Sequence, residues 1–180
     1  NSTVGTMGGC TIFRIGTYGA GSQFFPGYIS NLRVTTSLLY TTTFTPSTTT
    51  LTAITNTQLL TCQSNKFVDN STNAFTLTIS GTPKVATQNP FQINSGVSYY
   101  FDGTGDYLAT AENTGLWYLG TGDFTIEAWV YPTARVTNGA YIVARSQYGV
   151  GSDWVLQILN AGTLQFYMLT GGAGNIVTST

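Results

Sequence analysis

Residues 96–132, GVSYYFDGTGDYLATAENTGLWYLGTGDFTIEAWVYP, decide the fold of this 180-residue chain. They predict a strand, a turn, a second strand, a loop and a third strand. Residues 97–101 are β-branched and aromatic, and the glycines and aspartates of residues 102–106 are typical of a turn. Residues 124–131 alternate with a period of two, which turns four apolar side chains to one face: Phe124, Ile126, Ala128 and Val130. We expect that face to lie in the core.

Two phrases in this stretch, YFDG-x-GDYL followed by DFTIEAWVYP, resemble the opening half of a laminin-G-like, concanavalin A-like jelly-roll domain. The resemblance implies an all-β fold, an antiparallel two-sheet jelly-roll sandwich whose concave face often carries a glycan or protein ligand. The Thr- and Gly-rich variant, with GYISNLRV and LLTCQSNKFVDNSTNAFTLT nearby, is most similar to repeats in phage and cyanophage tail or virion proteins. It therefore implies a tandem repeat with a structural or adhesive role.

The composition excludes several classes of protein. Hydrophobic residues make up 42% and charged residues 7%, so the chain is neither disordered nor a coiled coil. A net charge of −1, with six basic residues scattered along the chain, leaves no electrostatic footprint for nucleic acid or an anionic membrane. The sequence has no histidine, which excludes a Ser-His-Asp triad, a Cys-His pair and a His-ligated zinc site within it.

The order of the phrases predicts parts of two units. Residues 1–46 resemble the C-terminal strands of one laminin-G-like unit, and residues 57–180 resemble the N-terminal part of a following one. Residues 47–56, rich in threonine and serine, are predicted to be the connector. We expect a fragment of a longer tandem-repeat protein. The alternative is a permuted or strand-exchanged unit, in which the first segment completes the second. Under either hypothesis, unpaired strand edges need partners.

Two aspartates could hold a metal ion. Asp102 and Asp106, separated by Gly-Thr-Gly, offer oxygen ligands of the kind that Ca²⁺ takes, and relatives implied by the resemblance often hold calcium at the sandwich rim. The same pattern is also an ordinary turn. Asp69 and Asp123 are similar loop aspartates and weaker candidates. The turn is the favoured interpretation, so we expect no cofactor, and Ca²⁺ at Asp102 and Asp106 is the alternative.

Aromatic residues offer candidate ligand contacts, because an aromatic ring can stack on the apolar side of a sugar. We take Trp129, Tyr131 and Trp154 as the candidates, with packing in the core or in an interface as the alternative. No spacing rule connects Cys10 with Cys62, and a β-domain of this length needs no disulfide, so we expect free thiols.

A catalytic role is not expected. Glu127 might suggest a glycosidase, but a retaining glycosidase needs two carboxylates about 5 Å apart. The nearest acid, Asp123, lies four residues earlier, or about 13 Å along a strand. The sequence therefore predicts a non-enzymatic module of a virion, in a tail fibre or capsid-attached fibre. Its expected partners are copies of itself, other virion proteins or a neutral host glycan. The alternative is a secreted or cell-surface bacterial carbohydrate-binding or adhesion domain.

Overall fold

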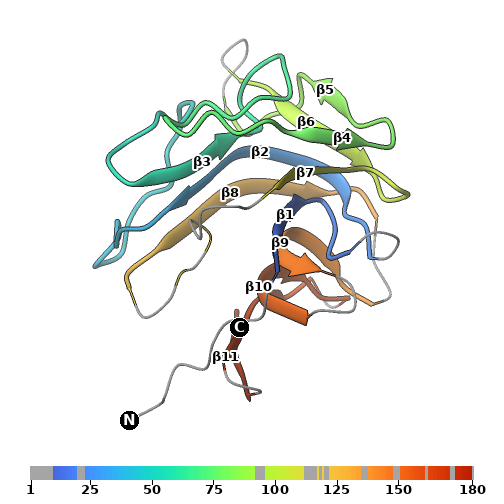
Figure 1. Cartoon of the computed structure of the whole chain (residues 1–180). Helices are drawn as coiled ribbons and strands as arrows, with labels where there is room; N and C mark the ends of the chain where they lie inside the picture. The colour runs from blue at the N-terminus through green and yellow to red at the C-terminus, as the bar shows by residue number, and fades with distance from the viewer. Residues whose placement is uncertain are drawn as a thin grey trace.

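The chain folds into two antiparallel β-sheets that pack face to face. A computed structural model describes residues 10–19, 23–91, 96–111, 117, 119, 122–134, 138–147, 151–160, 162–170 and 173–179. Every regular element in these ranges is a β-strand (Figure 1). The predicted all-β, two-sheet jelly-roll sandwich is confirmed. No helix in the described part of the chain is long and apolar enough to cross a membrane.

The larger sheet has seven strands in the order β12-β11-β10-β9-β1-β7-β4. Their bounds are β1 (Ile12–Ile15), β4 (Thr78–Ser80), β7 (Tyr107–Ala111), β9 (Ala140–Gln147), β10 (Gly151–Ile158), β11 (Leu164–Thr170) and β12 (Ala173–Thr178). All neighbours pair antiparallel.

The smaller sheet has five strands and is built around the longest one. Its strands are β2 (Pro26–Thr35), β3 (Thr57–Thr61), β5 (Lys84–Ala86), β6 (Ser98–Asp102) and β8 (Thr125–Pro132). β8 lies along one edge of β2, while β6 and then β3 share the other edge, and β5 continues beyond β6. Asn31 is the extra residue of a bulge in β2, with a φ of 52°. β2 and β8 arch above β1 and β9 in Figure 1.

The strand pairing corrects the predicted division into two units. β1 and β2 belong to the segment 1–46, yet β1 pairs with β7 and β9, and β2 pairs with β3, β6 and β8, which all come from 57–180. The two segments thus form one sandwich, as in the alternative that the first segment completes the second. Residues 47–56 do not link separate units, because Leu51 and Thr52 are hydrogen-bonded to the side chains of Asn31 and Arg33 in β2.

The core lies between the sheets and is rich in aromatic rings. Phe13 of β1 stacks on Trp117, with ring centroids 4.2 Å apart, and meets the edge of Trp154 at 5.7 Å. Cys10 and Cys62 are both buried, and they do not form a disulfide with each other. Burial raises the pKa of the Cys62 thiol, so this cysteine stays protonated and unreactive.

Candidate ligand-binding groove

Three tyrosines form a row across the face of the five-stranded sheet that points away from the core, here called the outer face. Tyr28 of β2 lies directly opposite Tyr100 of β6 and Tyr131 of β8. The ring of Tyr28 is 4.9 Å from that of Tyr100 and 6.2 Å from that of Tyr131. The next residue along β2, Ile29, is fully buried, as the alternation of a strand requires. This tyrosine row is therefore a continuous aromatic surface that three distant segments build.

A second row lies beside the tyrosines. Ser30 is opposite Trp129, whose ring meets Phe91 edge-on at a centroid distance of 6.4 Å. The two rows border a groove of about 280 Å³, the outer-face groove, lined by Tyr28, Ser30, Gln88, Asn89, Pro90, Ser98, Trp129, Val130 and Tyr131. None of these residues is charged. The hydroxyl of Ser98 is buried beneath the groove and has no hydrogen-bond partner among the described residues.

Asn89 fixes one wall of the outer-face groove. Its side-chain amide donates hydrogen bonds to the carbonyls of Thr87 and Gly96, at 2.8 and 2.9 Å. Its side-chain oxygen accepts the N–H of Phe91 at 2.9 Å. These three bonds hold the loop that carries Gln88 in place, so the groove is formed before any ligand arrives.

An ion pair lies further along the outer face. Arg33 donates its Nε to Glu127 Oε1 at 2.7 Å, and Tyr40 donates its hydroxyl to Glu127 Oε2 at 2.7 Å. Burial raises the pKa of Tyr40, and the hydrogen bond to Glu127 adds to this effect. Both oxygens of Glu127 are therefore used to attach the segment around Tyr40 to β2 and β8. The carboxylate that suggested glycosidase chemistry has a structural role.

The structure separates the three aromatic candidates. Tyr131 and Trp129 lie on the outer face, with 58% and 36% of their surface exposed, and both line the outer-face groove. Trp154 is fully buried, and its indole N–H donates to the carbonyl of Trp117 at 2.9 Å. The prediction that Trp154 contacts ligand is wrong, because the side chain fills the core beside Phe13.

Asp102 and Asp106 are hydrogen-bonded to backbone amides. Asp106 is 1% exposed, and its carboxylate accepts the N–H of Thr82 at 2.6 Å and that of Asp102 at 3.1 Å. Asp102 is exposed and accepts the N–H of Thr104 at 2.6 Å. The described residues contain no group of three or more acidic or cysteine side chains that could hold a metal ion. This donor set fits a turn and does not fit Ca²⁺, which takes six to eight oxygen ligands.

The strand order and the sandwich point to one group of folds. A family model described as the concanavalin A-like lectin/glucanases superfamily matches residues 102–180. The matched part contains β7 to β12, which are five strands of the larger sheet and β8 of the smaller sheet, and it includes the outer-face residues Trp129 and Tyr131. The fold is accordingly that of a concanavalin A-like sandwich. Neither a curated protein nor a solved structure matches the chain.

The sequence did not identify the other members of the groove. Tyr28, Tyr100 and Ser98 belong to two strands that only the pairing register places beside Trp129 and Tyr131. The period-two alternation of residues 97–101 was a usable signal, since it sets Ser98 and Tyr100 on the face opposite to the buried Tyr99 and Phe101.

Proposed function

We propose that this chain is a non-enzymatic binding module that holds a neutral carbohydrate in the outer-face groove. The observation that carries the proposal is the exposure of Trp129 and Tyr131 at the border of a groove without charged residues. An aromatic face pairs with the apolar side of a pyranose ring, and the exposed side-chain amide of Gln88 in the groove lining suits sugar hydroxyls. The match to a superfamily named for lectins and glucanases supports the same ligand class.

Binding without catalysis is supported by the state of the acidic side chains. Glu127 is paired with Arg33, and Asp69 accepts the backbone N–H groups of Leu60, Ser71 and Phe75. These carboxylates hold the fold together, whereas a glycosidase needs two that face the scissile bond.

The finer proposal is that the module is structural or adhesive in a virion, within a tail fibre or a capsid-attached fibre, and meets a host surface glycan. It rests on the resemblance of the Thr- and Gly-rich phrases to phage repeats. A secreted bacterial adhesion domain is the alternative, and it would use the same groove. Peptide-mapping mass spectrometry of the native source separates the two, because only the first hypothesis expects capsid or tail proteins beside this chain.

The test of the groove is a screen of neutral and acidic oligosaccharides, followed by calorimetric titration of the best binder. We expect Trp129→Ala and Tyr131→Ala each to weaken binding about tenfold, equivalent to about 1.4 kcal/mol. Tyr167→Ala is the matched control, because Tyr167 lies on the outer surface of the other sheet, against Tyr141 and Ile176. The proposal fails if no neutral glycan binds, or if the control loses as much affinity as the groove variants.

A further inference from the structure

The tyrosine row runs across the strands in steps of similar length. Tyr131 of β8, Tyr28 of β2 and Tyr100 of β6 follow one another, with ring centroids 6.2 and 4.9 Å apart. These steps follow from the spacing of neighbouring strands, which is about 4.8 Å. One pyranose residue of an extended polysaccharide has a similar length. Each of the three rings can therefore stack on one sugar of a chain that lies along the row.

Both ends of the tyrosine row are open. In the described part of the chain β8 pairs only with β2, so no strand there lies beyond Tyr131, whose side chain is exposed. At the other end, Lys84 of β5 lies opposite Tyr100, and it is exposed too. A site for the terminal sugar of a glycan is closed at one end. This row instead lets a chain continue past both of its ends.

One side of the row is bordered by a wall. Gln88, Asn89 and Pro90 line the outer-face groove together with Trp129. The hydrogen bonds of Asn89 to the carbonyls on either side of the loop hold this wall in place. Gln88 is exposed in the wall, and its side-chain amide suits the hydroxyl groups at the edge of a sugar whose face lies on Tyr28.

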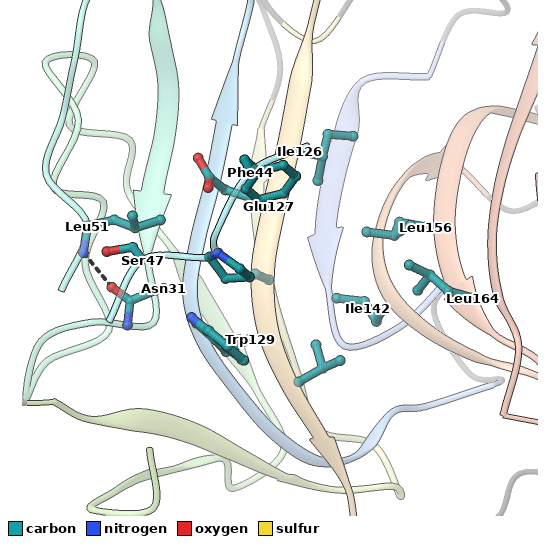
Figure 2. A pocket seen from close by; sticks show the side chains of 13 residues that line it. Asn31, Phe44, Ser47, Leu51, Ile126, Glu127, Trp129, Ile142, Leu156 and Leu164 are labelled. Carbon is teal, nitrogen blue, oxygen red and sulfur yellow. Dashed lines mark hydrogen bonds between the residues drawn. The ribbon is translucent and has the colours of Figure 1, made fainter. Parts of the chain in front are cut away.

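The segment 40–52 lies on the outer face beyond Trp129. Leu51 of this segment donates its N–H to the side-chain oxygen of Asn31 in β2 at 2.7 Å, which is the dashed line in Figure 2. Phe44 of the same segment lines a groove together with Trp129 (Figure 2). A ligand that ran along the strands past Trp129 would meet this segment. The open direction for a long ligand is therefore across the strands.

The three tyrosine rings do not lie in one plane. The ring of Tyr28 makes an angle of 45° with that of Tyr100 and of 46° with that of Tyr131. The flat face of a crystalline polysaccharide needs coplanar rings beneath it. A single chain, by contrast, follows tilted rings by rotation about its glycosidic bonds. The row therefore fits one separate chain and does not fit a crystal face.

We propose that the outer face binds an internal stretch of one extended, neutral polysaccharide chain with the linkage of cellulose, one sugar on each tyrosine of the row. The inference rests on the proposed function and adds the length, shape and direction of the ligand. A chain with this linkage is straight and presents successive ring faces along a line, whereas the chain of starch curves into a helix and leaves the row. Tyr100, which is not among the groove-lining residues, becomes a ligand contact.

The test is calorimetric titration of the intact chain with cello-, xylo- and manno-oligosaccharides, each from the monosaccharide to the hexasaccharide. We expect the affinity for the best series to rise about tenfold with each sugar up to the trisaccharide, because each addition covers one more ring, and then to level off. Malto-oligosaccharides consist of the same sugar as the cello series but have a helical shape. They should bind at least about tenfold more weakly than the best series.

Tyr100→Ala tests the far end of the row. It should weaken trisaccharide binding about tenfold and leave disaccharide binding within about twofold, since two sugars still find Tyr131 and Tyr28. The preserved disaccharide affinity also shows that the variant is folded. Tyr100→Phe is the matched control, because it keeps the ring and loses only the hydroxyl. It should bind every length as the wild-type chain does.

The outcomes separate this inference from the proposed function. A neutral monosaccharide whose affinity longer chains do not improve overturns the inference and leaves the proposed function intact. So do malto-oligosaccharides that bind as tightly as the best series, a Tyr100→Ala variant that treats disaccharide and trisaccharide alike, or binding confined to neutral glycans outside the three series. If no neutral glycan binds, the proposed function is wrong, and the inference fails with it.

Discussion

Removing the Asp106 carboxylate should destabilise the fold, with or without calcium. The side chain is 1% exposed and accepts two backbone amides, those of Thr82 and Asp102. A hydrogen bond to a charged group contributes about 1.5–3 kcal/mol, so Asp106→Ala should lower the free energy of unfolding by about 3 kcal/mol. For a domain of this size the Tm should then fall by about 6–12 °C. Urea and thermal unfolding followed by tryptophan fluorescence measure both quantities.

Asp102→Ala is the matched variant, because Asp102 lies in the same turn, is exposed, and has a carboxylate that accepts the backbone N–H of Thr104. It should cost about 0.5–1 kcal/mol. If the two aspartates shared a calcium ion, both substitutions would cost a similar free energy of unfolding. A chelator would then lower the Tm of the wild-type chain by several degrees. Equal losses for the two variants, or a chelator-dependent Tm in the wild-type chain, would refute the account of this turn.

Two further predictions concern buried aromatic residues. Trp154→Ala should lower the free energy of unfolding by about 3–5 kcal/mol, because Trp154 fills the core. Trp129→Ala should lower it by less than about 1 kcal/mol, because Trp129 is exposed. Urea titration measures both losses. Burial raises the pKa of the Tyr99 phenol above 10.0, so the folded state keeps this proton longer than the unfolded state does. The stability that this raised pKa contributes is complete below pH 10 and is lost as the pH rises through the pKa of the folded state. Urea unfolding midpoints measured across this pH range should therefore decline, and Tyr99→Phe should make the decline smaller.

Local structure followed from the sequence because it depends on near neighbours. The alternation in residues 124–131 predicted which side chains of β8 face the core, and Phe124, Ile126, Ala128 and Val130 do pack against it. The turn predicted at residues 102–106 joins β6 to β7, with Gly103 and Gly105 at φ values of 86° and 80°. Glycine tolerates these angles because it has no Cβ.

The arrangement of the strands did not follow, because pairing depends on backbone groups that every residue shares. In a sandwich of this kind, the last strands of the unit lie beside its first strands. A segment that resembles the last strands can therefore pair with first strands that precede it in the chain or with first strands that follow it. The order of phrases in the sequence therefore could not tell two units from one. The ion pair between Arg33 and Glu127, 94 residues apart, is a result of that pairing and was equally hidden.

The two tryptophans chosen as ligand contacts show what the sequence could still have decided. In residues 154–158, WVLQI, Trp154 shares its phase with Leu156 and Ile158, so an apolar face includes the tryptophan. In β8, Trp129 shares its phase with Glu127 and Tyr131, and the opposite phase is apolar. The same period-two rule thus assigns the first ring to the core and the second to the surface. A tryptophan in phase with polar neighbours is the better ligand candidate, because its exposure has no packing explanation.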